Sequence, residues 1–554
     1  MKVKKNQIYD TIDSKNGKEM EKFFNTAGPI QKDINYYISS FDRVDYEEIE
    51  MLITSRKYFV LHAPRQTGKT SALLEIMERI NNEGVYDCVY ANIEPAQAQR
   101  GDTKESIPTI CDIIASSIRL YLGDDSIVIW YRKNRHEIPV GKQISEVLTH
   151  WCEQSQKPCI LLLDEVDALV GDTLISLLRQ IRAGYNQRPK SFPQSMILCG
   201  IRDVRDYRIH TKDNEIITGG SAFNIKAESL KMDNFTFEEC QELYRQHTDF
   251  TGQKFDEKIF HYLWLDTKGQ PWLVNTLGHE LTWKERELRD RTKEITLKHY
   301  FRARERLIYS RATHLDQLVD KLQEPRVKRV IELMLKGDNK KNSFNPRDIE
   351  YLVDLGLISR TQKGKIEIAN SIYKETIPRE LTWGVQSSIS NQETIWYIKE
   401  DNSIDMPKLL KAFQQFFREN ADSWIERFDY KEAGPQLLLQ AFLQRIINGG
   451  GRINREYGLG RKRTDIFIEY PLDKELGFFG DEIQRVVIET KILYSNLDKT
   501  IEKGLEQTLE YADFVGSNDA HLIIFNRNKG VEWEKKIWNK EMSYQGRKVL
   551  VWGS

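Results

Sequence analysis

The chain has 554 residues, of which 40% are hydrophobic and 30% are charged, a composition typical of a soluble protein with several domains. Lys and Arg number 82 against 83 Asp and Glu, so the net charge is -1 and any surface for nucleic acid has to be local. No apolar run reaches the roughly 18 residues of a membrane span, and the first residues lack the apolar core of a signal peptide. We therefore expect a cytoplasmic protein with no membrane partner. The six cysteines include no CxxC pair, which argues against a zinc site or a disulfide framework.

The first half of the chain has the pattern of an α/β fold. Residues 1–20 are polar and predict a flexible tail. Over 21–222, short apolar runs alternate with helical patterns, and runs that are apolar on both faces are typical of parallel strands covered by helices. The predicted strands are 59–63, 89–93, 159–165 and 195–200.

The stretch "YFVLHAPRQTGKTSALLEIM" predicts a strand, a phosphate-binding loop and a helix. Such a loop needs backbone N–H groups at a helix N-terminus, a lysine for the β- and γ-phosphates and a hydroxyl for Mg²⁺. Alanine occupies position 63, where the motif has its first glycine, but the spacing to the Gly-Lys-Thr run is intact. We expect the loop to bind ATP through Pro64, Arg65, Gln66, Thr67, Gly68, Lys69 and Thr70.

A second acidic signal supports this nucleotide site. The apolar run "CILLLDEVD" ends in Asp164 and Glu165, and adjacent acids at the end of a buried strand are costly unless a cation or water uses them. We expect Asp164 and Thr70 to hold Mg²⁺, and Glu165 to orient or deprotonate the attacking water.

The pattern changes after the α/β region. Residues 223–310 predict a helical lid, with Thr236 as the N-cap of one helix, and residues 311–382 predict a winged helix that ends in the strand–turn–strand pattern "LGLISRTQKGKIEIAN". The polar stretch 383–405 is the predicted linker. A new α/β pattern then fills residues 406–554.

The segments "FFNTAGPIQKDINYYISSFDR", "LLLDEVDAL" and "CGIRDVRDY", together with the loop, resemble the bacterial AAA-like ATPases of the signal-transducing STAND type over about residues 20–380. The resemblance implies that Pro271 of "GQPW" contacts the nucleotide and that Arg202 lies near the γ-phosphate. It also implies a winged helix that takes part in the switch, whereas DNA reading by it is the less favoured alternative. Arg179 and Arg182 are candidate arginine fingers for a neighbouring subunit, although a solvated helix face is favoured.

Near the end of the chain, two strand-like runs carry acids. Residues i and i+2 of a strand share a face, so Glu489 and Lys491 of "RVVIETKIL" project together. If the run 461–470 pairs with this one as a hairpin, with 470 opposite 485, Asp465 joins them. Two carboxylates at that range gain most from a shared Mg²⁺.

This arrangement resembles the PD-(D/E)XK nuclease superfamily over about residues 425–530, which implies an α/β restriction-endonuclease-like domain. The resemblance adds Glu432 on the preceding helix, with a solvated acid as its alternative, and Gln507 with Tyr511 on the following helix. Two features depart from the family pattern, because no proline precedes Asp465 and a gap of 24 residues separates it from Glu489.

Arginine, lysine and tyrosine side chains precede Asp465 in "GGGRINREYGLGRKRTD" and could contact phosphates. The favoured interpretation is an ATP-regulated, Mg²⁺-dependent nuclease that acts on nucleic acid, DNA before RNA, in a setting of prokaryotic defence that only the resemblance implies. The alternative is a nucleotide-dependent switch or scaffold whose last domain binds nucleic acid or protein without cutting. Homo-oligomerisation stays open.

Overall fold

The computed structural model describes residues 21–201, 208–210, 216–218, 226–309, 320–335, 345–361, 364–381, 397–425, 435, 438–440, 442–443, 452–457, 464–473, 482–494, 496–526, 528 and 530–554, some of them, such as 464–465, by their backbone alone. The chain forms two compact units, which are described separately below. One comprises residues 1–311 with 350–371, and the other comprises 312–349 with 372–554. None of the described helices is both long enough and apolar enough to cross a membrane.

A five-stranded parallel sheet is the centre of the first unit, with the strand order β4-β5-β6-β3-β9. Its strands are β3 (Tyr58–His62), β4 (Asp87–Asn92), β5 (Cys159–Asp164), β6 (Ser195–Gly200) and β9 (Lys226–Lys231). The first four agree with the predicted strands to within two residues. The fifth lies beyond residue 222, the predicted end of this region. β7 (Arg208–His210) and β8 (Ile216–Thr218) form a separate antiparallel hairpin.

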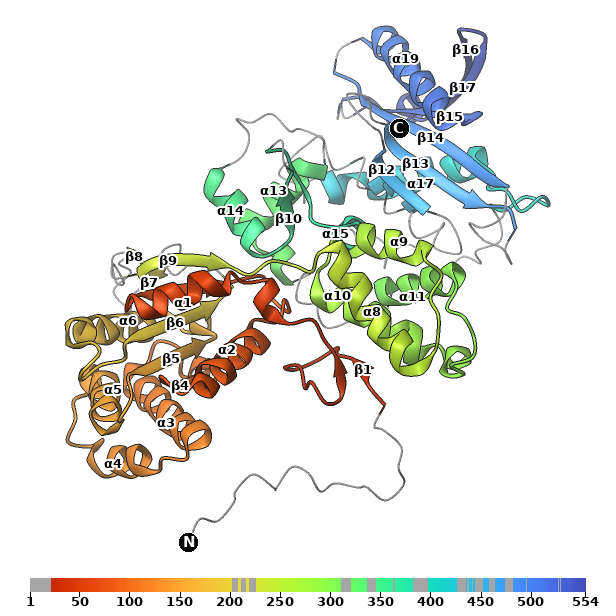
Figure 1. Cartoon of the computed structure of the whole chain (residues 1–554). Helices are drawn as coiled ribbons and strands as arrows, with labels where there is room; N and C mark the ends of the chain where they lie inside the picture. The colour runs from red at the N-terminus through yellow and green to blue at the C-terminus, as the bar shows by residue number, and fades with distance from the viewer. Residues whose placement is uncertain are drawn as a thin grey trace. The chain divides into compact units, whose positions relative to one another are not determined.

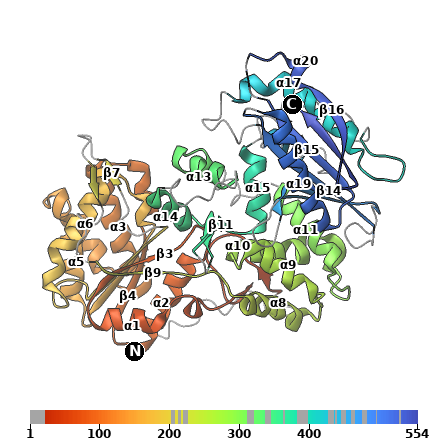
Figure 2. The ribbon, with the colours of Figure 1, turned by 90° about the horizontal axis from the view of Figure 1, so that it is seen from above.

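Both faces of this sheet are buried, as the continuous apolar runs predict. Alternate strand residues divide between two cores: Val60 and Leu161 pack against α3, α5 and α6, whereas Leu61 and Leu162 pack against α1 and α2. Figure 2 shows the sheet between these two groups of helices. The helices are α1 (Tyr46–Thr54), α2 (Lys69–Glu83), α3 (Thr103–Leu122), α4 (Ser126–Asn134), α5 (Gln143–Gln154) and α6 (Gly171–Gly184), with short 3-10 turns at Ser40–Asp42, Glu94–Gln99, Val140–Lys142, Val166–Ala168 and Tyr185–Gln187.

A group of helices follows β9 in the same unit (Figure 1). It comprises α8 (Phe237–Thr251), α9 (Lys258–Thr267), α10 (Pro271–His279) and α11 (Leu297–Tyr309), with a π-helical turn at Glu280–Lys284 and a 3-10 turn at Arg286–Arg289. The predicted N-cap is confirmed, since the Thr236 side chain accepts from the Glu239 backbone and the Glu239 side chain accepts from the Thr236 backbone.

The N-terminal segment packs against these helices. Its two short parallel strands are β1 (Phe23–Phe24) and β2 (Asn35–Tyr36). The Trp272 ring N–H donates to the Thr26 carbonyl at 3.0 Å, and the backbone N–H of Tyr37 donates to the Gln246 side chain at 3.0 Å. A few residues later the segment contacts the sheet unit, because Ser40 donates to the Glu75 carboxylate of α2 from its backbone at 2.8 Å and from its hydroxyl at 2.5 Å. The segment therefore joins the helical group to α2.

Gly269 allows the turn into α10 to approach Phe235 closely. Its φ is 71°, and a Cβ added there would lie 1.8 Å from the Phe235 carbonyl oxygen. We expect Gly269→Ala to lower the free energy of unfolding by at least about 2 kcal/mol, since backbone strain and a clash with main chain combine. Chemical denaturation measures the loss. Gly252→Ala is the matched control, because Gly252 has a φ of 77° but nothing within 4 Å of the added Cβ. Equal losses in the two variants would contradict the role given to Gly269.

The region predicted as a winged helix contains α13 (Pro325–Leu335), α14 (Pro346–Asp354), an antiparallel hairpin of β10 (Ile358–Arg360) and β11 (Ile366–Ile368), and α15 (Ser371–Leu381). The division between the two units passes through α14 and the start of α15. Within the first unit, the turn after α14 contacts the phosphate loop, because a Cβ on Gly356 would lie 2.9 Å from the Pro64 side chain.

The second unit contains a six-stranded mixed sheet with the order β12-β13-β14-β15-β17-β16. The strands β12 (Arg452–Tyr457), β13 (Thr464–Pro471) and β14 (Ile483–Ile492) are antiparallel neighbours, β14, β15 (Asp519–Phe525) and β17 (Arg547–Gly553) run parallel, and β16 (Trp538–Tyr544) returns antiparallel. The helices are α17 (Met406–Ile425), α19 (Leu497–Val515) and α20 (Trp533–Lys536). One face of the sheet packs on α19 through Phe467, Val487 and Leu522, which meet Leu505 and Leu509.

Candidate functional site

The phosphate loop joins β3 to α2 in the geometry that the motif predicts. Gly68 has a φ of 92° and Gln66 a φ of 57°, so the left-handed positions lie in the second half of the loop. Ala63 is fully buried and is not a positive-φ position, which explains why alanine replaces the first glycine without a conformational cost. The Lys69 ammonium donates to the carbonyls of Ala63 and Pro64, at 3.1 Å each. Its charge is therefore held at the mouth of the loop.

The end of β5 meets the start of α2, as predicted. The Thr70 hydroxyl donates to Asp164 Oδ2 at 2.7 Å, and the Tyr90 hydroxyl donates to the same oxygen at 3.0 Å. Asp164 is completely buried. An acid and a hydroxyl at this separation fit a Mg²⁺ site, because that ion takes oxygen ligands and often only one carboxylate.

Glu165 follows in an unusual backbone conformation, with a φ of 57°. It lines a cavity of about 270 Å³ together with Lys69 and Thr70. Burial raises the pKa of its carboxyl, Lys69 opposes this rise, and the charges of Asp167, Asp164 and Glu94 add to it. A raised pKa in a cavity suits a general base.

The pKa shift predicts a pH dependence for ATP hydrolysis. A general base works only when deprotonated, so hydrolysis by the wild type is lost as the pH falls, beginning at a higher pH than an ordinary glutamate would give. Asp167→Asn removes one charge that raises the pKa, and we expect the acid limb of the rate profile to move to lower pH. Glu165→Gln should bind ATP and lose turnover by about 100-fold or more. Normal turnover in Glu165→Gln would contradict the role of Glu165.

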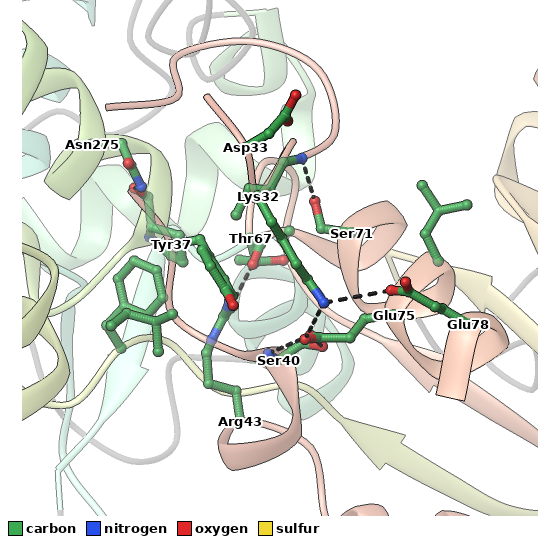
Figure 3. A pocket seen from close by; sticks show the side chains of 16 residues that line it. Lys32, Asp33, Tyr37, Ser40, Arg43, Thr67, Ser71, Glu75, Glu78 and Asn275 are labelled. Atoms are coloured by element: carbon green, nitrogen blue, oxygen red, sulfur yellow. Dashed lines mark hydrogen bonds and ion pairs between the residues drawn. The ribbon is translucent and has the colours of Figure 1, made fainter. Parts of the chain in front are cut away.

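A larger cavity of about 420 Å³ lies next to the loop (Figure 3). Apolar and aromatic side chains from three parts of the first unit line it, including Tyr37, Leu74 and Phe235. Ile30, Gly68, Ser71, Pro271 and Asn275 line both cavities. The predicted contact of Pro271 therefore lies at the site, where Pro271 begins α10.

Sequence reasoning assigned no role to the N-terminal wall of this site. The backbone N–H of Ile30 donates to the Ser71 hydroxyl at 3.0 Å, and Arg43 donates to the Thr67 carbonyl at 2.5 Å. The segment that contains Ile30 and Arg43 was part of the quoted resemblance, but no spacing rule identifies which of its residues reach the loop.

The other predicted nucleotide contacts differ in what the structure shows. Arg65 is exposed, and the Gln66 carbonyl accepts from the Gln270 side chain at 3.4 Å. Arg202 lies outside the described residues. Arg179 and Arg182 are exposed on α6, as both of their alternative roles require.

In the second unit, Glu489 and Lys491 lie on one face of β14. Lys491 Nζ is 2.5 Å from Glu489 Oε1, and Glu489 is only 3% exposed. Alternation along the strand puts both residues on the face of Val487, which packs against α19. The acid and the ammonium are therefore neighbours on the side of the sheet that α19 covers.

The predicted hairpin register was wrong by one residue. Tyr470 pairs with Gln484, not with 485, and Ile466 pairs with Ile488. One further step in this register brings the backbone of Asp465 opposite Glu489, whereas the predicted register put it opposite Thr490. Because directly opposite residues of an antiparallel pair share a face, the observed register gives Asp465 the parity of Glu489. The Asp465 side chain lies outside the described residues.

Gln507 and Tyr511 lie one turn apart on α19. Tyr511 belongs to the core between α19 and the sheet, and the buried side-chain oxygen of Gln507 has no hydrogen-bond partner among the described residues. Glu432 lies outside them, as do Arg461, Lys462 and Arg463. Within the described part of the chain, no group of three or more His, Cys, Asp or Glu side chains could hold a metal ion.

The parallel sheet, the loop at the start of α2 and the acid pair at the end of β5 define a P-loop NTPase. The family model described as "AAA-like domain" matches residues 25–377, which is more than half of the chain. The chain therefore belongs to the AAA-like family, and its first part is an AAA-like P-loop ATPase.

Three solved structures are similar in fold. The Walker-type ATPase PABY2304 of Pyrococcus abyssi is 14% identical with a TM-score of 0.43, covering 64% of this chain and 99% of that one. Cdc6p from Pyrobaculum aerophilum is 13% identical with a TM-score of 0.34, covering 62% and 94%. The RuvB Holliday junction branch migration motor of Thermotoga maritima is 12% identical with a TM-score of 0.32, covering 61% and 96%. At these TM-scores the similarities carry no argument about function. No curated protein matches the chain.

Proposed function

We propose that the protein is an ATP-regulated, Mg²⁺-dependent nuclease, in which a STAND-type ATPase of residues 21–382 controls phosphodiester cleavage by residues 406–554. The observation that carries the nuclease part is the Glu489–Lys491 pair, with 2.5 Å between Nζ and Oε1, on the α19 face of β14. An ammonium beside a buried carboxylate at a strand end is suited to phosphate chemistry, because the ammonium offsets charge that develops on the phosphate.

The ATPase part rests on the loop and its acids. Thr70 and Asp164 would hold the Mg²⁺, which screens the β- and γ-phosphates when bound. Lys69 at the loop mouth neutralises phosphate charge, and Glu165 accepts a proton from the attacking water. The buried position and raised pKa of Glu165 support this assignment.

In the second unit, Glu489 and Asp465 would be the metal ligands. A bound Mg²⁺ would supply charge stabilisation at the scissile phosphate. Lys491 would position water or a phosphate oxygen, and Gln507 would donate or accept a hydrogen bond at the rim. The free oxygen of Gln507 and the backbone register of Asp465 are consistent with these roles.

The substrate is nucleic acid, and we propose DNA before RNA. β12 carries Arg452 and Arg455 and is the edge strand beside β13, the strand of Asp465. Basic residues next to the acids would hold the phosphate backbone. Homo-oligomerisation could bring Arg179 or Arg182 to a neighbouring ATP site, and size measurements with and without ATP test it.

The direct test of the substrate class is cleavage of end-labelled DNA and RNA of the same sequence by the full chain with ATP and Mg²⁺. We expect DNA fragments that EDTA prevents. If neither polymer is cut although ATP is hydrolysed, the switch or scaffold alternative replaces the nuclease.

A further inference from the structure

A guanidinium is buried beside the phosphate loop and is held there by main-chain oxygens. Arg43 is 7% exposed. Its Nε and Nη2 donate to the Asp233 carbonyl at 3.0 and 2.8 Å, and Nη2 also donates to the Thr67 carbonyl at 2.5 Å. The guanidinium carbon lies 4.7 Å from the centre of the Phe235 ring. The side chain thus has one position, fixed by the loop and by the segment that follows β9.

This buried charge has no counterion among the described residues. Its contacts are carbonyl oxygens and an aromatic ring, and no carboxylate of the described chain forms an ion pair with it. A second buried arginine of the same unit differs, since Arg304, 5% exposed, lies 2.9 Å from Asp266 and 2.8 Å from Glu305. A buried charge is costly unless it is paired, so Arg43 lacks a partner that Arg304 has.

Arg43 stays charged at neutral pH. Burial lowers the pKa of its guanidinium to about 10, against the opposing charges of Glu239 and Asp233. The missing partner is therefore an anion, not a neutral acceptor alone.

The remaining nitrogen of Arg43 lies next to the N-terminus of α2. None of the hydrogen bonds between described residues uses Nη1, and a Cβ built on Gly68 would lie 3.5 Å from it. Arg43 lines the 420 Å³ cavity together with Gly68 and Ser71, and Figure 3 shows it bonded to Thr67 at this cavity. Helix N-termini favour anions through free N–H groups and the helix dipole. Two independent positive features therefore meet here.

We propose that Arg43 is a nucleotide-binding residue whose Nη1 donates to an anionic oxygen of the phosphate chain, on the side of Gly68 where the larger cavity lies. The proposal rests on the nucleotide-binding part of the proposed function. Arg43 acts in addition to Lys69, which lines the smaller cavity.

The same side chain also joins the bound nucleotide to the helical group. Asp233, whose carbonyl Arg43 holds, returns a bond from its backbone N–H to the Arg43 carbonyl at 3.1 Å. Phe235, under the guanidinium, donates from its backbone to the Gly269 carbonyl at 2.9 Å, and Gly269 precedes α10. Phosphate binding at Arg43 would therefore bear directly on the turn from which α10 starts.

The test is calorimetric titration of the full chain and of Arg43→Gln with ATP, ADP, pyrophosphate and adenosine. We expect Arg43→Gln to bind ATP, ADP and pyrophosphate about 10- to 100-fold more weakly, as loss of a charge-assisted bond predicts, with adenosine unchanged. Arg43→Lys keeps the charge and should recover part of the affinity. Arg245→Gln, an exposed arginine of α8, is the control for loss of a positive charge.

Thermal unfolding separates binding from folding. A structural role would lower the midpoint of Arg43→Gln with and without pyrophosphate by equal amounts, whereas the binding role removes the shift that pyrophosphate gives to the wild type. Unchanged affinity in Arg43→Gln, or adenosine weakened as much as ATP, would overturn the proposal and leave the proposed function standing. A wild-type chain that binds neither ATP nor pyrophosphate would overturn both.

Discussion

Lys69→Ala is expected to remove ATP binding and, with it, all ATP-dependent behaviour of the chain. Lys69 is 6% exposed and begins α2, where its ammonium faces the loop carbonyls of Ala63 and Pro64 at 3.1 Å. Removing one member of a buried charge pair costs about 2–5 kcal/mol of binding free energy, which is roughly 30-fold or more in Kd. Titration with a fluorescent ATP analogue measures the loss.

The control for this experiment is Lys104→Ala, which removes an exposed lysine from the first turn of α3. It should bind ATP as the wild type does. If Lys69→Ala keeps an affinity within about 3-fold of the wild type, the loop is not the phosphate site.

Glu489→Ala is expected to abolish nucleic-acid cleavage while ATP hydrolysis continues. The substitution removes a proposed metal ligand and the partner of Lys491, and loss of an organised metal costs several kcal/mol of transition-state stabilisation. We expect a decrease in cleavage rate of at least about 100-fold, with Asp465→Ala giving the same result. Gel analysis of a labelled DNA and phosphate release from ATP measure the two activities side by side.

Glu502→Ala removes an exposed acid of α19 and is the matched control, with no expected change in either activity. If Glu489→Ala cleaves at the wild-type rate, the acid and lysine of β14 form a structural ion pair.

The ATPase fold and the nucleotide loop could be predicted because their signals are local. The strands β3, β4, β5 and β6 are each short apolar runs, and Gly68, Lys69 and Thr70 are adjacent in sequence. β9 escaped prediction because "KAESLK" has charged residues at three of its six positions, so its place at the edge of the sheet depends on pairing with β3.

The rest of the nucleotide site depends on contacts between distant residues. Arg43 meets Asp233 across 190 residues, and Trp272 meets Thr26 across 246. No periodicity or spacing predicts such pairs. Arg43 had one weak signal, its place at the end of the apolar and aromatic run "NYYISSF", and burial of that charge could be known only from the fold.

In the second unit, strand parity correctly grouped Glu489 with Lys491, since it needs only the alternation of one strand. The register between β13 and β14 was wrong by one residue, because a long connection leaves the pairing open. Packing decides it, as Phe467 pairs with Val487 and both enter the core under α19.

The most direct test of an ATP-regulated nuclease is the rate of Mg²⁺-dependent DNA cleavage by the purified full chain, measured with ATP, with ADP and without nucleotide. We predict cleavage that changes at least about 10-fold between these nucleotide states, because control requires the two states to differ in free energy by ~1.4 kcal/mol or more. We also predict that Lys69→Ala loses this dependence and that Glu489→Ala does not cleave in any state. Cleavage at one rate in all three conditions, or none in any of them, would contradict the account.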